Sequence, residues 1–188
     1  MKLSEHKDLK VEILALPPKE KDKLLLRLVA KDKVLTEHLH FLLLEDESNL
    51  RDRVSDIKQL ITQNLQSFKS AKSVNAKDVL TNLRKLAKAV NHNFRVTKAG
   101  FEDVDLRLFL YNNTITEFKS GIFSSYKNYD ELFAKFFIKS TLITMRKFEK
   151  LHEDLQFDLR NEMNSLLKKV HAGNMANMAI ELGLPENL

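Results

Sequence analysis

The sequence predicts an all-α fold, because apolar residues recur every three or four positions along nearly the whole chain and no strand-length alternation stands out. Only 4 Gly and 3 Pro interrupt the 188 residues, and the 43% hydrophobic content is enough for a core. We expect about eight helices, joined as antiparallel hairpins in a single domain over residues 1–188, with a soft boundary near 95–101. An irregular bundle and a degenerate helical-repeat array both fit this pattern.

The first 70 residues predict three or four helices. The first should end near the Pro17-Pro18 pair, since the residue before a proline is pushed out of the α region. Pro18 can then occupy the first turn of the next helix. One bent helix or two short ones fit residues 18–44, because the apolar pattern pauses at 31–33. Ser48 is a candidate N-cap for a helix that runs to about Ser70.

Four or five further helices follow in the second half of the chain. Asn75 is a candidate N-cap for a basic helix, and the apolar spacing predicts another helix over 102–118. Residues 130–172 contain no Gly or Pro and form either one long helix or two, with a break near 152–154. A last short helix is expected over 175–182.

Several classes of chemistry are excluded by composition. The chain has no Cys, so it forms no disulfide, thiolate zinc site, iron–sulfur cluster or cysteine nucleophile. Its glycines are too far apart for a Rossmann or Walker loop. No apolar run approaches the length of a membrane span, and the N-terminus has no signal-peptide core. We expect a cytoplasmic protein without a cofactor that binds a partner and does not catalyse a reaction.

Positive charge is concentrated in residues 57–101, which carry nine basic residues and one acidic residue, a net charge of +8 within a chain of +5. On the helix that opens at Asn75, four cations advance by seven, four and seven residues, which places them on one side. This pattern predicts a surface for nucleic acid or another polyanion. The alternative is a solvated face that keeps the protein soluble. The candidate residues are Lys77, Arg84, Lys85, Lys88, Arg95 and Lys98.

A helix-turn-helix over residues 86–100 is a less favoured interpretation of the same region. Asn91 can stand in for the glycine of the turn, but Gly100 interrupts the second helix too early. A helix end followed by a connecting turn explains these residues more simply.

Two Glu-x-x-His pairs raise the hypothesis of a di-metal carboxylate bundle. Spacing i, i+3 places Glu37 with His40, and Glu149 with His152, on one side of a helix each. Glu149 nevertheless lies away from the apolar stripe of its own helix. Surface pairs are the favoured interpretation, and the metal hypothesis ranks third.

Ten of the fifteen aromatic residues lie between Phe101 and Phe137. Such rings usually pack on the core, but those in the expected loop are candidates for a protein interface. The interface candidates are Phe123, Tyr126 and Tyr129. A protein-interaction or scaffolding module, with a partner protein or by self-association, is therefore the first functional expectation, and polyanion binding is the alternative.

The order of elements also carries a resemblance. The segments Leu16-Pro-Pro-Lys-Glu-Lys-Asp-Lys-Leu-Leu-Leu26 and 39–44 precede a basic helix, and Leu106-Arg-Leu-Phe-Leu-Tyr111 precedes the aromatic loop. This pattern resembles that of uncharacterised all-helical bacterial proteins of similar length. The resemblance implies a helical, bacterial, cytoplasmic protein and adds nothing about chemistry.

Overall fold

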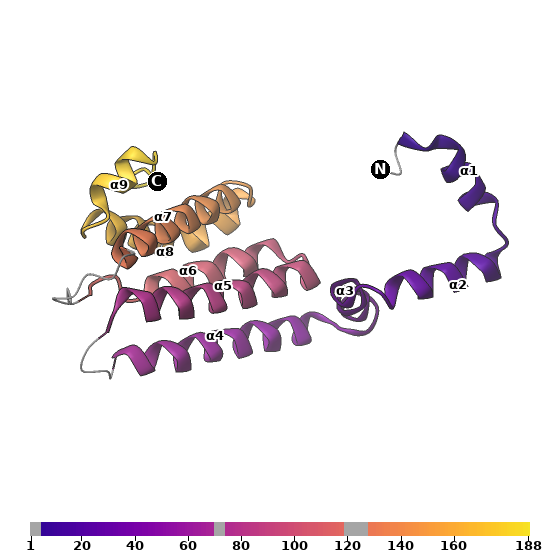
Figure 1. The fold of residues 1–188 in the computed structure, drawn as a ribbon, viewed down its shortest axis with the longest axis horizontal. Helices are drawn as coiled ribbons and strands as arrows, with labels where there is room; N and C mark the ends of the chain where they lie inside the picture. Colours follow the sequence, from indigo (N-terminus) through magenta and orange to yellow (C-terminus); the bar gives the residue numbers. More distant parts are fainter. Residues whose placement is uncertain (1–4, 70–73, 119–127) are drawn as a thin grey trace. The chain divides into compact units, whose positions relative to one another are not determined.

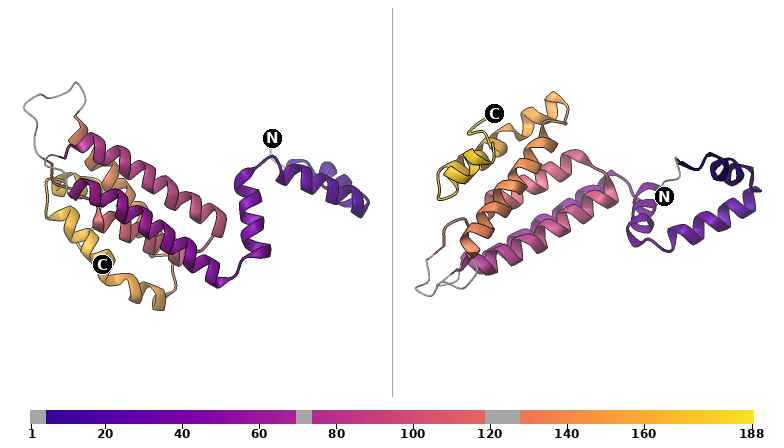
Figure 2. Two further views of the ribbon diagram at one scale, coloured as in Figure 1. Left: turned by 90° about the horizontal axis from the view of Figure 1, so that it is seen from below. Right: turned by 45° about the horizontal axis from the view of Figure 1, so that its top comes forward.

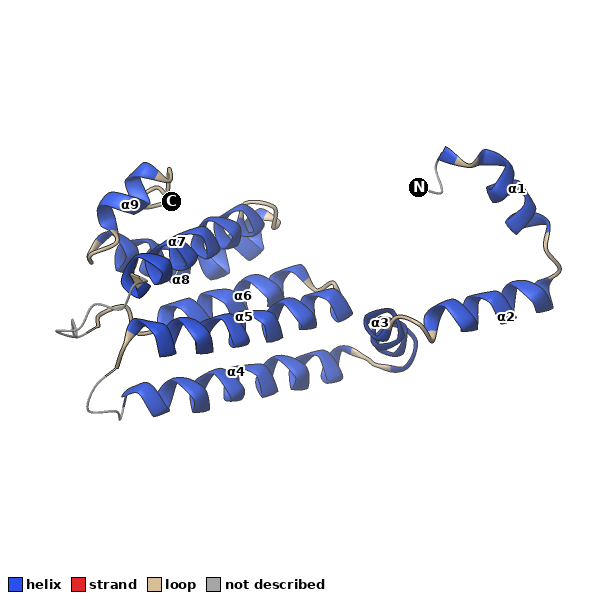
Figure 3. Ribbon diagram, viewed as in Figure 1, coloured by secondary structure: helices blue, strands red, loops and turns tan. Residues whose placement is uncertain are grey.

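The computed structural model describes residues 5–69, 74–118 and 128–188, and this part of the chain is all-α, as predicted. It contains helices and no strand (Figure 3). The chain folds as two compact units, residues 1–45 (unit 1) and 46–188 (unit 2). The helices within the described ranges are α1 Lys7–Ala15, α2 Pro18–Val29, α3 Lys33–Leu44, α4 Glu47–Lys69, α5 Ala76–Thr97, α6 Gly100–Asn113, α7 Tyr129–Phe148, α8 Glu153–His171 and α9 Ala176–Glu181.

Unit 1 contains α1, α2 and α3, and it resolves the choice between one bent helix and two over residues 18–44. The chain turns at 30–32, where Asp32 becomes the N-cap of α3 and accepts hydrogen bonds from the backbone N–H groups of Val34 (2.9 Å) and Leu35 (3.2 Å). The Thr36 hydroxyl donates to the Val29 carbonyl, which ties α3 to the end of α2. None of the described side chains of unit 1 is buried.

Unit 2 is a helical bundle in layers, with α4 on one side of the α5–α6 pair and the α7–α8 pair on the other (Figure 1). The further views in Figure 2 show α4 to α8 running side by side, and α9 packs on α7 and α8. Residues 95–101, where the sequence suggested a soft boundary, lie inside unit 2 and include the short connection between α5 and α6, which pack together.

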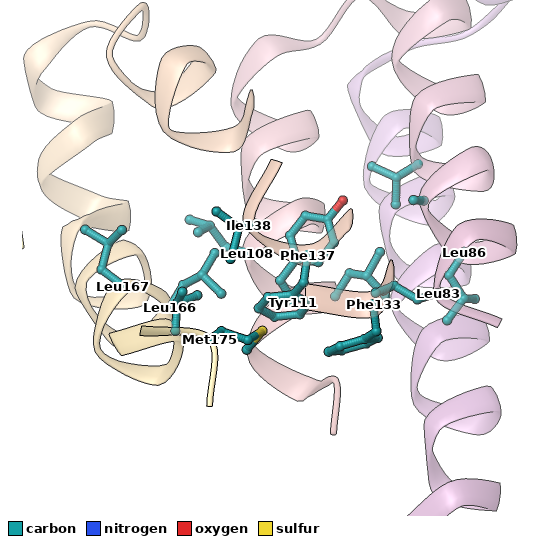
Figure 4. Close-up of a cluster of buried hydrophobic side chains, with 14 of the residues drawn as sticks. Leu83, Leu86, Leu108, Tyr111, Phe133, Phe137, Ile138, Leu166, Leu167 and Met175 are labelled. Atoms are coloured by element: carbon teal, nitrogen blue, oxygen red, sulfur yellow. The ribbon is translucent and has the colours of Figure 1, made fainter. Parts of the chain in front are cut away.

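The hydrophobic core lies entirely within unit 2 and draws side chains from α4 to α9. Figure 4 shows its centre, where aliphatic side chains of α5, α6 and α8 surround aromatic rings of α6 and α7. The Tyr111 ring meets Phe137 edge-on at 5.6 Å, and the Phe133 ring stacks on Phe137 at 5.5 Å. Burial of these aromatic and aliphatic surfaces is the main stabilising contribution to the bundle.

The helix expected over 102–118 is shorter than predicted, because α6 ends at Asn113. The side chains of Asn113 and Thr114 bond the carbonyls of Phe109 and Leu110, which competes with continuation of the helix. The Lys169 ammonium, from α8, donates to the backbone carbonyls of Tyr111 and Asn112, and also to that of Thr114. A distant cation therefore satisfies the C-terminal carbonyls of α6 and fixes where it ends.

Residues 130–172 form two helices, with the break close to the predicted place. Helix α7 ends at Phe148, and α8 begins at Glu153 after the N-cap His152. The Gln156 amide donates to the Leu151 carbonyl at 2.8 Å, so a side chain of the second helix occupies a carbonyl of the connection. Without Gly or Pro, the break is set by this local hydrogen bonding.

The N-cap of α4 is Asp46, and the expectation of Ser48 at that position was wrong. The Asp46 carboxylate accepts hydrogen bonds from the backbone N–H groups of Ser48 (2.8 Å) and Asn49 (3.2 Å). The Ser48 hydroxyl also donates to it at 2.7 Å. A carboxylate at the positive end of the helix carries a full charge, which a serine hydroxyl does not.

These hydrogen bonds hold the pKa of Asp46 below its usual value of 3.8, and the bond from the Ser48 hydroxyl has the largest effect. The folded state therefore favours the charged carboxylate. Its contribution to the free energy of unfolding is fully present above pH 3.8 and disappears as the pH falls through the lowered pKa. We expect Ser48→Ala to move the pKa of Asp46 back toward 3.8 in a carboxyl titration followed by NMR. An unchanged Asp46 titration in this variant would contradict the assignment of the cap.

Helix α5 ends in a left-handed residue that is not glycine. Lys98 has φ 57° and ψ 12°, and its N–H donates to the Phe94 carbonyl at 2.9 Å. Left-handed backbone costs an L-residue about 1–2 kcal/mol, whereas glycine adopts it freely.

We therefore expect Lys98→Gly to raise the free energy of unfolding by up to about 1 kcal/mol, measured by urea denaturation. The matched control is Lys85→Gly in the middle of α5, which should lower it by about 1 kcal/mol. Equal losses in the two variants would show that the backbone at Lys98 is not strained.

Candidate functional site

The candidate site is the basic face of α5, defined by Lys77, Arg84, Lys85, Lys88, Arg95 and Lys98. All six side chains are exposed, as the spacing of Lys77, Arg84, Lys88 and Arg95 predicted for these four. The helix begins where the sequence indicated, since the Asn75 side chain accepts a hydrogen bond from the Asp78 N–H at 2.8 Å. The opposite side of α5 is held in the core by Val79, Leu83 and Val90, among others. The helix is therefore fixed by one side while its cations remain on the other.

No acidic side chain of the described residues forms an ion pair with any of the six cations. The acidic residue within α5, Asp78, is hydrogen-bonded to the Asn75 amide at 2.8 Å. Other cations of unit 2 do pair with acids: Lys58 lies 2.7 Å from Asp105. Because the charge of the basic face is not neutralised by these side chains, its field extends into solvent.

Helix α7 lies beside α5 and contributes to an aromatic seam, defined by Tyr129, Phe136 and Phe94. The Lys77 ammonium lies 5.7 Å from the centre of the Tyr129 ring, and the Arg84 guanidinium lies 5.4 Å from that of Phe136. Further along the two helices the roles are exchanged: α5 supplies the ring and α7 supplies the cation. These contacts follow one another in the same direction along both helices, so α5 and α7 are parallel.

The reversed contact is made by Lys147, whose ammonium lies 3.9 Å from the centre of the Phe94 ring. Cation–π contacts of this kind each contribute about 0.5–1 kcal/mol when exposed and more when desolvated. They hold the aliphatic stems of long cations against the protein. Two of the six cations of the basic face, Lys77 and Arg84, are therefore positioned by rings of α7.

An ion cluster, defined by Asp103, Arg107 and Lys147, adjoins this seam; Asp103 and Arg107 are buried and Lys147 is partly exposed. The Asp103 carboxylate, 1% exposed, is 2.9 Å from Nε of Arg107 and 2.7 Å from the Lys147 ammonium. The Arg107 guanidinium also donates to the side-chain carbonyl of Asn91 on α5. The Asp103 carboxylate thus joins α6 to α7, and the Arg107 guanidinium joins α6 to α5.

The hydroxyl of Tyr111 extends this polar region into the core. Burial raises the pKa of Tyr111 above its usual value of 10.0, against the opposing effects of a hydrogen bond with Ser140 and of Arg107. The phenol therefore stays protonated at neutral pH and acts as a neutral hydrogen-bonding group between α6 and α7.

The ion pairs of Asp103 and Asp105 were not predicted from the sequence. Asp103 also lies in the first turn of α6, where a negative charge is favoured by the positive end of the helix dipole. The i, i+4 spacing of Asp103 and Arg107 was a readable signal. The contribution of Lys147 had no signal in the sequence, because 44 positions separate it from Asp103.

Of the four metal candidates, Glu37 and His40 lie in unit 1, and Glu149 and His152 lie in unit 2. Glu149 and His152 are not on one helix, because the first is the C-cap of α7 and the second is the N-cap of α8. His40 lies 2.9 Å from Glu45. No group of three or more His, Asp or Glu side chains suited to a metal ion occurs in the described ranges.

Two of the three interface candidates, Phe123 and Tyr126, lie outside the described residues. The third, Tyr129, is the first residue of α7 and belongs to the aromatic seam, where Lys77 lies over its ring.

The helix-turn-helix interpretation of residues 86–100 was wrong, because α5 continues without a break through Asn91 to Thr97. Within the described ranges, no helix combines the length and the apolar character needed to cross a bilayer.

Removing the carboxylate from the ion cluster should be costly. We expect Asp103→Asn to lower the free energy of unfolding by about 3–5 kcal/mol, because Arg107 and Lys147 lose their counter-charge within the protein. Asp105→Asn is the control, since its partner Lys58 is about one-third exposed, and its loss should stay below about 1 kcal/mol. Similar small losses in both variants, measured by urea denaturation, would show that the cluster is not a stabilising element.

Comparison with known proteins adds no assignment to this site. No family model, no curated protein and no solved structure matches this chain. The resemblance to all-helical bacterial proteins therefore stays a prediction, and a function is to be inferred from the geometry of the site.

Proposed function

We propose that this protein binds the phosphate backbone of double-stranded nucleic acid through the basic face of α5. The observation that carries the proposal is a line of exposed cations on one straight, well-anchored helix, without an acidic partner among the described side chains. Lys and Arg contacts to phosphates supply most of the affinity of non-specific nucleic-acid binding.

The length of the basic face fits a duplex. Lys77 and Arg95 are 18 residues apart, which corresponds to about 27 Å at a helical rise of about 1.5 Å per residue. This length spans about eight base pairs of B-form DNA. Arg84 and Lys88 lie one helical turn apart in the middle of the line. The four aligned cations can therefore face phosphates over this length of a duplex.

The aromatic seam favours a duplex over an unpaired strand. Single-strand binding usually needs exposed rings on which bases stack. Tyr129, Phe136 and Phe94 are each half-buried, and each ring already carries a cation. The rings therefore position the cations and are not free to stack with bases. Contacts to phosphates alone carry no sequence information, so the proposed binding is not sequence-specific.

The proposal is tested with a fluorescent 20-base-pair DNA duplex and fluorescence anisotropy at 50 to 200 mM salt. We expect the logarithm of the binding constant to fall linearly with the logarithm of the salt concentration. The double variant Arg84→Glu/Lys88→Glu should lose at least tenfold in affinity. The slope of this plot should be shallower by the amount expected for about two phosphate contacts, because two contacts are removed.

The control variant is Arg160→Glu/Lys168→Glu on α8, where both side chains are exposed and the change in net charge is the same. This variant should stay within about twofold of the wild type. Equal losses in the two variants would assign the affinity to net charge and not to the basic face. Absence of binding at 50 mM salt would reject the proposal.

Protein interaction is a second proposed function, and a separate observation favours it. None of the described side chains of unit 1 is buried, although its helices are rich in leucine. The aromatic residues first considered for an interface do not carry this proposal, since Tyr129 is half-buried in the aromatic seam and the other two lie outside the described residues. The supporting surface is therefore that of α1, α2 and α3.

A further inference from the structure

We infer that unit 1 is a self-association module, through which α3 of one copy of this chain packs against α3 of a second copy. The inference rests on the second proposed function and names its partner. The helices of unit 1 are well formed locally, but their described side chains enclose no hydrophobic core.

Local hydrogen bonding specifies the helices of unit 1. Pro18 is the first residue of α2. In the turn at 30–32, the N–H groups of Lys31 and Asp32 donate to carbonyls of α2. The Asp32 side chain then caps α3. Segments of about 40 residues seldom hold a fold alone and usually depend on disulfides, metals or oligomerisation. This chain has no Cys, and its described residues hold no metal-ligand cluster.

Large aliphatic side chains cover the surface of unit 1. Each of ten is more than one-third exposed, and Leu43 and Leu44 reach 72% and 74%. These side chains are spread over α1, α2 and α3, so an interface of standard size, about 800 Å² per partner, has to reach beyond α3. The ten residues are Leu9, Val11, Leu14, Leu25, Leu26, Leu28, Leu35, Leu42, Leu43 and Leu44.

Helix α3 is the centre of this surface, because its apolar residues occupy more than one face. Leu35, Leu39 and Leu42 follow at spacings of four and three, and Val34 and Phe41 lie on another side. A helix that is apolar on several sides is normally covered on several sides. Within unit 1, α3 contacts α2 near the turn that joins them, and Leu42 (62%) and Leu43 (72%) are exposed.

Charge favours a second copy as the occupant. Helix α3 has one basic and one acidic residue, Lys33 and Glu37, so it is neutral apart from its histidines. In a two-fold symmetric contact the same surface lies on both sides, so a charged centre would repel its own copy. The neutral aliphatic surface of α3 avoids this repulsion, whereas the basic face of α5 would not.

The test measures the molar mass of the full chain by sedimentation equilibrium from 1 to 200 µM. We expect a dimer for the wild type, and at least a hundredfold weaker association for Leu42→Asp/Leu43→Asp. Leu42→Gln/Leu43→Gln should also weaken it, since it removes apolar contact without adding charge. The matched control is Phe157→Asp in α8, which replaces a 76% exposed ring of unit 2 and should leave the dimer intact.

Circular dichroism of each variant checks that helicity is retained, as expected for side chains that are mostly exposed. A monomeric wild type, a dimer that survives both substitutions at Leu42 and Leu43, or a dimer lost in Phe157→Asp would each overturn self-association through α3. If the wild type is monomeric, binding of the dye 8-anilinonaphthalene-1-sulfonate separates self-association from the more general protein-interaction function. If the wild type binds the dye and Leu42→Asp/Leu43→Asp does not, α3 presents an apolar surface to another protein. If the wild type does not bind the dye, the protein-interaction function is overturned as well.

Discussion

The architecture of unit 2 depends on the burial of α6 on nearly all sides. Leu106 and Leu110 share one side of α6 and Leu108 lies nearly opposite, yet each is at most 1% exposed. A helix of this kind needs neighbours all around, and α6 packs against α4, α5, α7 and α8. With α6 central, α5 and α7 lie parallel on its flank, and the side chains between them form the aromatic seam.

Unit 2 uses its cations in two different ways. Arg107 and Lys147 are drawn inward by the Asp103 carboxylate, where they join helices that are distant in sequence. The six cations of the basic face point outward and form no ion pair within the described residues. This separation explains how one chain can have a polar cluster in its interior and still present a single-sign surface.

Much of the secondary structure could be predicted from local signals. Helical spacing predicted the all-α class, and Asn75 marked the start of α5. The break near 152–154 was expected from the usual length of helices, since the apolar spacing of residues 130–172 also fitted one long helix. Periodicity failed at the end of α6, because Ile115 and Phe118 continue the apolar spacing after the helix has stopped at Asn113. The carbonyl contacts of Lys169 come from more than 50 residues away and have no local signal.

The candidate site could be predicted only in part, for the same reason. The spacing of Lys77, Arg84, Lys88 and Arg95 follows from helix geometry alone. Their ring partners depend on α7 lying beside α5, which is a property of the packed bundle. The exposure of leucines in unit 1 was also hidden, because a sequence pattern shows that leucines share a helix and not whether anything covers them.

The rings beneath Lys77 and Arg84 have an entropic consequence. A free lysine or arginine side chain loses up to about 2 kcal/mol of rotamer freedom when it is immobilised by an anion. A side chain that already rests on Tyr129 or Phe136 samples fewer rotamers beforehand, so it gives up less on binding. Lys85, Lys88 and Arg95 have no such ring contact among the described residues, so equal charges along one helix differ in how readily they can be fixed in place.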